Sequence, residues 1–268
     1  MFDNILIATD NSPLMRNAIQ YTAKLFPYSD YHLINVINTS DGSIPQTPLM
    51  QKHLKEISKD ALAKGRRTLN NMGIEEVKLA MPMGTPSKEI MKYTTSHQID
   101  LIVMATHSKV GAQKVHIGET ALNSLELTHI PSLVFACECK PKMPKKIFNP
   151  TSFSTYSEYA TMLALELAAY FGASLTVYHI GKGDPGASGR RIKKKADSEG
   201  VDYKLVTDTD ASDEDILEEM KKYDFMVGSR GRGGLLYKFR HIFPTLALSS
   251  LEKELIAETE IPFLMVGD

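Results

Sequence analysis

The sequence predicts an α/β fold of two tandem Rossmann-like domains, each a five-stranded parallel sheet with helices on both faces. Three observations carry this prediction. The 268 residues exceed one average domain, the same order of elements occurs twice, and the strands are continuous apolar runs, as in sheets buried on both faces. Strands that alternate with helices require right-handed crossovers and therefore pair in parallel.

The first half begins with an apolar strand over 5–8, the turn and cap residues ATDNSP, and a helix over 15–26. A second apolar strand is predicted over 33–37. After a connecting helix, a short strand over 77–80 precedes the helix SKEIMKYTTS. The half ends with the strand DLIVMA from Asp100, a helix, and the strand SLVFA.

The second half repeats this order. A strand over 146–149 and the segment PTSFSTYS precede a helix over 158–171 that ends at a glycine. Strands follow over 175–180 and 203–206, then the helix DEDILEEMKKY, a strand from Asp224, and a last strand FLMVG.

These elements predict a domain over 1–139, a linker over 140–145 with the polar sequence KPKMPK, and a domain over 146–268. Each domain ends in an apolar strand whose bare edge would invite aggregation, so we expect the two to pack as an intramolecular pseudo-dimer. We also expect homo-oligomers of such pseudo-dimers. The polar segment over 38–51 is either a tolerated insertion or a lid.

Composition excludes several classes of partner. The net charge of -1 provides no overall attraction to nucleic acid or to an anionic membrane, and no apolar run approaches the roughly 20 residues of a spanning helix. We therefore expect a cytoplasmic protein with neither nucleic acid nor membrane as partner. Cys137 and Cys139 are too few for a thiolate zinc site, the histidines lack ligand spacing, and the run RRIKKK indicates a solvated helix face.

Ligands of open parallel sheets bind at the carboxyl ends of strands, where the strand order reverses. The segment GSRGRGGLL over 228–236 follows the fourth strand of the second half. Its glycines allow backbone N–H groups to approach a phosphate, and it predicts a phosphate site. The candidate residues are Gly228, Ser229, Arg230, Gly231 and Gly234. Neither a Walker motif nor a Rossmann G-x-G-x-x-G is present, which argues against P-loop hydrolases and dehydrogenases.

With ATDNSP, NVIN, GTPSKEI and the segment DLIVMATHSKVGAQKVHIGETALNSL, the chain resembles the universal stress protein family, and does so twice along its length. In that family, nucleotide-binding members carry G-x2-G-x9-G-(S/T) after the fourth strand, an aspartate after the first and a valine after the second. The resemblance therefore implies that Asp10, Val36 and Gly118 contact the nucleotide in the first half.

Both phosphate motifs depart from the family pattern. In the first half, Ala105 and Ser108 replace the leading glycines, and Glu119 places a carboxylate at a helix N-terminus where phosphate would bind. In the second half, about eight additional residues interrupt the motif before Ser249 and Ser250. There Ile180 corresponds to the family valine, and Thr151 or Ser152 stands where the aspartate belongs.

Three functions follow. The first is a stress-associated module that binds or senses ATP or AMP, with Mg²⁺ entering only with the nucleotide, and the intact glycines make the second half the better candidate. The second is a nucleotide-free scaffold for an unknown protein partner. The third, a weak ATP hydrolase, lacks a catalytic constellation, so we expect the chain not to be an enzyme.

Overall fold

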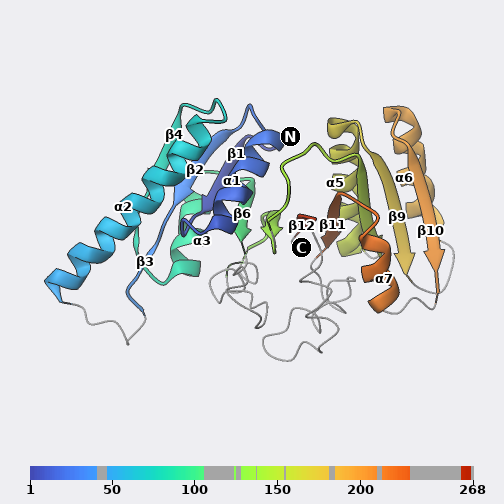
Figure 1. Ribbon diagram of the computed structural model, residues 1–268. Coiled ribbons are helices and arrows are strands. Elements are labelled where there is room, and N and C mark those ends of the chain that lie inside the picture. The colour runs from blue at the N-terminus through green and yellow to red at the C-terminus, as the bar shows by residue number, and fades with distance from the viewer. Residues whose placement is uncertain are drawn as a thin grey trace. The chain divides into compact units, whose positions relative to one another are not determined.

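The structure, a computed structural model, describes most of the chain (Figure 1). The described residues are 1–40, 47–105, 124, 128–136, 138–153, 155–180, 185–209, 213–229 and 261–266. They form two compact units, and the boundary between the units falls between Lys142 and Met143, within the predicted linker.

The first unit contains strands that pair in parallel in the order β7-β6-β1-β2-β4. The sheet's strands are β1 (Asn4–Ala8), β2 (Asp30–Ile34), β4 (Val77–Ala80), β6 (Leu101–Ala105) and β7 (Ser132–Phe135). Strands β3 (Ile37–Asn38) and β5 (Met83–Gly84) form a separate parallel pair. The helices are α1 (Pro13–Leu25), α2 (Pro48–Asn70) and α3 (Pro86–Ser96).

Local sequence explains where these helices begin. Each has a proline in its first turn, where the missing N–H costs no intrahelical hydrogen bond. The side chains of Ser12 and Thr47 precede α1 and α2 and accept hydrogen bonds from Met15 N and Met50 N. The capping hydroxyls and prolines therefore fix both helix starts.

Helices cover both faces of the first sheet. Neighbouring residues of β2 show this, because side chains of a strand alternate between faces. The His32 ring contacts Tyr93 of α3, with 3.0 Å between Nδ1 and Oη. Leu33 instead packs on Gly65 of α2, so closely that a Cβ atom added to Gly65 would lie 3.0 Å from Leu33 Cδ1.

The second unit has the strand order β10-β9-β8-β11-β12, again with parallel pairing. Its strands are β8 (Lys146–Thr151), β9 (Ser174–Ile180), β10 (Tyr203–Asp208), β11 (Phe225–Ser229) and β12 (Phe263–Val266). Its helices are α5 (Thr155–Phe171), α6 (Gly186–Glu199) and α7 (Asp213–Met220). The predicted α/β class is therefore confirmed in both halves, and the pseudo-dimer stays a prediction.

Two predictions about local structure have different outcomes. The second apolar strand is present, but the predicted bounds of 33–37 are wrong, because β2 runs over Asp30–Ile34 and the chain starts a second small sheet at Ile37. The basic run lies on helix α6 as predicted, where Arg191 pairs with Glu158 and Lys195 pairs with Glu166 at 2.9 Å. Among the described residues, no helix is long and apolar enough to cross a membrane.

Candidate functional site

A fixed turn follows β1 at the carboxyl edge of the first sheet. Thr9 Oγ1 accepts a hydrogen bond from Asn11 N at 3.2 Å, and Asn11 adopts a left-handed conformation with φ 62. Asp10 lies between them, exposed, and its Oδ1 accepts from Ser12 N at 2.9 Å. Arg16 Nη1 also donates to Asn11 O at 2.8 Å. These bonds present the Asp10 carboxylate to solvent from a turn with a defined conformation.

Asn35 joins the ends of three neighbouring strands. Its Nδ2 donates to Thr9 O at 2.6 Å and its backbone N–H donates to Ala80 O at 3.1 Å. Asp10 and Val36 each lie two residues beyond the last pair of β1 and β2, Ala8 and Ile34. Since parallel strands end at the same edge, the two residues that the family resemblance selects belong to one surface of the sheet.

The second unit repeats this turn after β8. Thr151 Oγ1 accepts from Phe153 N at 3.1 Å, and Phe153 has φ 53. In the register of β8 and β9, Thr151 pairs with His179. The Nδ1 atom of His179 lies 3.4 Å from Thr151 O. Thr151 therefore corresponds to Thr9, and Ser152 stands at the position of Asp10. The second unit has no carboxylate on this turn.

Phe153 changes the surface of the second unit further. An aromatic residue in the left-handed region is unusual, and here the ring of Phe153 lies 5.2 Å from the ring of His179 at the end of β9. Ile180, the predicted counterpart of Val36, is the last residue of β9 and follows His179 directly. An aromatic pair therefore lies where the first unit has Asn11 and Asn35.

Buried polar atoms without partners gather in the carboxyl half of the second sheet. Among the described residues, Asn149 Oδ1, Ser152 Oγ and Ser229 Oγ are buried and form no hydrogen bond. Such groups are rare in folded proteins and often mark a site that a water, ion or ligand completes. They lie on or directly after the neighbouring strands β8 and β11.

The strand register places Gly228 inside β11. Asp100 N donates to Asn4 O and Asp224 N donates to Lys146 O, so the two aspartates correspond. Counting from them, Ser229 corresponds to Ala105, and Gly228 lies one residue earlier, paired with Met265 of β12. Of the predicted phosphate residues, Gly228 and Ser229 therefore end a strand. Arg230, Gly231, Gly234, Ser249, Ser250 and Gly118 lie outside the described residues.

The structure also identifies three residues that sequence reasoning did not select, Thr9, Asn35 and His179. Thr9 and Thr151 hold the turns, and Asn35 and His179 contact the carbonyls of these threonines. A polar residue directly after an apolar strand was the available signal for Asn35. Among the described residues, no group of three or more histidine, cysteine or acidic side chains could hold a metal ion.

Comparisons with known proteins agree with this architecture. The sequence profile described as the universal stress protein family matches residues 1–136. Universal stress protein MJ0531 of Methanocaldococcus jannaschii is 28% identical over 152 residues, which are 54% of this chain and 85% of that protein. MJ0577 of the same organism is 26% identical over 85 residues, 32% of this chain and 52% of that protein.

Solved structures extend the similarity of fold to both halves. A universal stress protein from Archaeoglobus fulgidus has a TM-score of 0.77 at 20% identity and covers 98% of each chain. The functionally unknown protein PA1789 from Pseudomonas aeruginosa has a TM-score of 0.59 at 13% identity, covering 99% of this chain and 92% of its own.

Proposed function

Because this chain belongs to the universal stress protein family, we propose that it is a stress-associated module that binds an adenine nucleotide, AMP or ATP, without dedicated catalysis. One observation carries the proposal. Asp10 is exposed on a turn that Thr9 and Ser12 hold in place, and Val36 lies at the same sheet edge. These are the two positions at which the family resemblance implies contacts with the nucleotide.

The first unit is our choice for the adenosine end of the ligand. It keeps the carboxylate, whereas the second unit has Ser152 at that position and the Phe153 ring against His179. A carboxylate accepts hydrogen bonds from ribose hydroxyls or from an adenine amino group, and such charge-assisted bonds are among the stronger ones. The glycine-rich segment over 228–236 makes the second unit the competing site.

Glu119 lies outside the described residues, but the sequence predicts it at the helix N-terminus of the phosphate motif, where its charge would favour a nucleotide with few phosphates. A carboxylate at a helix N-terminus competes with phosphate for the same N–H groups and repels its charge. We therefore propose that AMP binds the first unit more tightly than ATP. Mg²⁺ has no protein site in this proposal and would enter only with a nucleotide.

Calorimetric titration of the full chain with AMP and ATP tests the proposal. Asp10→Asn keeps the oxygen that accepts from Ser12 N, so the turn is preserved while the charge is lost. We expect AMP affinity to fall about tenfold to hundredfold, the usual effect of losing a hydrogen bond to a charged group. The control Asp60→Asn removes the same charge on α2, where Asp60 pairs with Lys64, and should leave affinity unchanged.

Other outcomes assign the site elsewhere. Unchanged AMP affinity in Asp10→Asn, with loss in Gly231→Asp, would place the nucleotide in the second unit. The second candidate function is a nucleotide-free scaffold, which the missing carboxylate and the Phe153–His179 contact in the second unit support. No heat of binding at millimolar AMP or ATP in the unmodified chain would favour that scaffold.

A further inference from the structure

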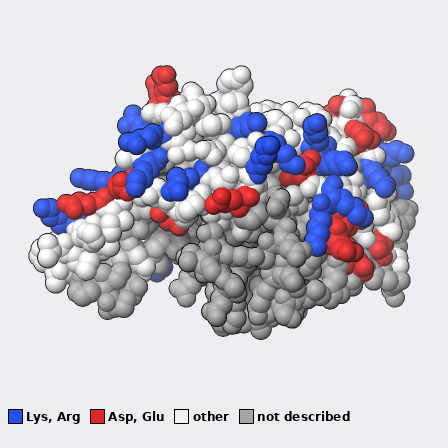
Figure 2. Space-filling view, viewed as in Figure 1, with Lys and Arg blue, Asp and Glu red and all other residues white. Residues whose placement is uncertain are grey.

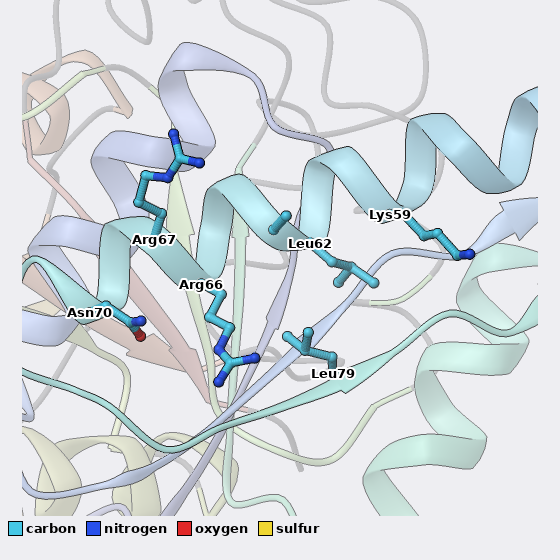
Figure 3. Close-up of a pocket in the computed structure, with 7 residues that line it drawn as sticks. Lys59, Leu62, Arg66, Arg67, Asn70 and Leu79 are labelled. Atoms are coloured by element: carbon cyan, nitrogen blue, oxygen red, sulfur yellow. The ribbon is translucent and has the colours of Figure 1, made fainter.

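A groove between α2 and β4 lies on the first unit, apart from the carboxyl edge (Figure 3). It has a volume of about 370 Å³. The lining residues are Lys59, Leu62, Ala63, Arg66, Arg67 and Asn70 of α2, with Leu79 of β4. Figure 3 shows Leu62 and Arg66 extending from α2 toward Leu79, while Arg67 points to the other side of the helix. The groove therefore has an apolar floor bordered by cations.

The charge of the groove is positive and unbalanced. None of its lining residues is acidic, and among the described residues no acidic side chain pairs with Lys59, Arg66 or Arg67. By contrast, Lys64 on the same helix pairs with Asp60 at 2.6 Å. Figure 2 shows Lys and Arg side chains along α2 on the face in view, with Asp and Glu side chains between some of them. A ligand with negative charge next to apolar groups complements this surface.

The outer edge of β4 presents backbone groups beside the groove. Asn35 N donates to Ala80 O, so the backbone groups of Ala80 face β2. Successive residues of a strand direct these groups to opposite edges, so the N–H and C=O groups of Val77 and Leu79 face outward. β4 ends the sheet, and no strand among the described residues pairs with this edge. An unpaired edge is a template for another strand.

We propose that this groove and edge form a docking site for an extended acidic peptide segment of a partner protein, which adds a strand to β4. Backbone hydrogen bonds to Val77 and Leu79 would align the segment, as in other cases of strand addition. Its alternate side chains would face α2, where acidic groups meet Lys59 and Arg66 and an apolar group covers Leu79. Leu79 is 43% exposed and lines the groove beside α2, so that apolar contact is left to be made.

A peptide fits this surface better than a single-stranded nucleic acid does. Nucleic-acid grooves combine cations with aromatic side chains on which bases stack, and no lining residue of this groove is aromatic. The free strand edge, in turn, offers hydrogen bonds in the spacing of a polypeptide. The site is independent of the nucleotide proposal, since it shares no residue with the turn at Asp10.

Fluorescence anisotropy of a labelled peptide, Glu-Thr-Val-Thr-Glu-Thr-Val-Thr, with the full chain tests the site. Its Glu and Val residues share one face of a strand. We expect saturable binding that weakens with added salt and falls about tenfold in Arg66→Glu, whereas the matched control Lys64→Glu stays within twofold. The same peptide with Lys in place of Glu should not bind.

A second pair of variants isolates strand addition. Val77→Pro removes one outward N–H, and proline is tolerated on an edge strand where that N–H faces solvent. Val77→Ala removes the same side chain and keeps the N–H. We expect Val77→Pro to bind the peptide about fivefold more weakly than Val77→Ala, as one hydrogen bond implies.

Three results would overturn the proposal: equal affinities of the Pro and Ala variants, equal effects of the Arg66 and Lys64 reversals, or tighter binding of an eight-nucleotide oligodeoxythymidine than of the peptide. Circular dichroism melts of each variant confirm that it is folded before its affinity is compared.

Discussion

His32 should make the stability of the first unit fall as the solution becomes acidic. Its side chain is buried, with 1% of its surface exposed, and its two ring nitrogens have different neighbours. Nδ1 lies 3.0 Å from Tyr93 Oη and Nε2 lies 3.4 Å from Lys78 Nζ. A neutral ring satisfies both when Nδ1–H donates to the phenol and Nε2 accepts from the ammonium. A charged ring would face the Lys78 cation directly.

The pKa of His32 is lowered from 6.5 to about 4. Burial is the largest cause, the charges of Lys78 and His97 lower the pKa further, and the charge of Asp30 raises it. Between pH 6.5 and pH 4, His32 therefore binds a proton in the unfolded chain but not in the folded chain. The free energy of unfolding falls as the pH falls through this range. Linkage between the two pKa values predicts a loss of about 1.2 kcal/mol at pH 5.5 and about 2.4 kcal/mol at pH 4.5, relative to pH 7.

Urea unfolding followed by circular dichroism at these three pH values measures the loss. His32→Gln replaces the titrating ring with an amide that can still form hydrogen bonds. The free energy of unfolding of this variant should therefore lack the two losses predicted for the unmodified chain at pH 5.5 and pH 4.5. The control His53→Gln changes an exposed histidine on α2 and should follow the unmodified chain. Parallel pH profiles of the unmodified chain and His32→Gln would refute the reasoning.

Two further predictions concern side-chain amides that donate to backbone carbonyls. Asn149→Ala should destabilise the second unit by about 2–3 kcal/mol in thermal unfolding, because it leaves a cavity and deprives Val227 O of the donor that lies 2.8 Å away; a loss below about 1 kcal/mol would contradict this. Asn17→Ala should speed the reaction of the Cys139 thiol with a disulfide reagent in a Cys137→Ser background, since Asn17 donates to Cys139 O and accepts from Cys139 N, both at 2.9 Å. Asn71→Ala, an exposed change at the end of α2, is the control and should leave that rate unchanged.

The sequence predicted the elements whose cause is local. Continuous apolar runs located β1, β6, β8 and β9 to within a few residues, and the glycine at 172, with φ 64, ends α5 as expected. The second strand was predicted, but its bounds of 33–37 differ from those of β2, Asp30–Ile34. Directly after β2, the Asn35 side chain donates to Thr9 O, which is far away in sequence, while its backbone N–H still continues the ladder to Ala80 O.

The candidate site was predicted less completely, because its turn depends on conformation more than on residue type. Asp10 and Val36 followed from the family resemblance, but the left-handed Phe153 contradicts the usual preference of aromatic residues. The sequence left open whether Thr151 or Ser152 corresponds to Asp10. The hydrogen bond from Phe153 N to Thr151 Oγ1 decides for Ser152, because it matches the bond from Asn11 N to Thr9 Oγ1. The glycine-rich segment likewise looked intact until the register placed Gly228 within β11.

Asn149 and Pro150 are neighbours on β8. They show how the second unit keeps its sheet although its sequence differs here from that of the first unit. The ladder between β8 and β11 stops at the pair of Phe148 and Met226, and Pro150 has no N–H with which to continue it. The Asn149 side chain donates to Val227 O instead, at a position where the first unit has the apolar Ile7. The side-chain amide therefore does the work of a backbone N–H that proline lacks.

At the carboxyl edge, the residues that hold the turn differ from the residue that we propose contacts a ligand. In both units a threonine hydroxyl holds the turn by accepting from the residue two positions later, at 3.2 Å in one and 3.1 Å in the other. The residue between, Asp10 or Ser152, is not needed for that bond. Since the turn survives the change from aspartate to serine, the Asp10 carboxylate is available to a ligand without cost to the fold, and replacing it should alter binding far more than stability.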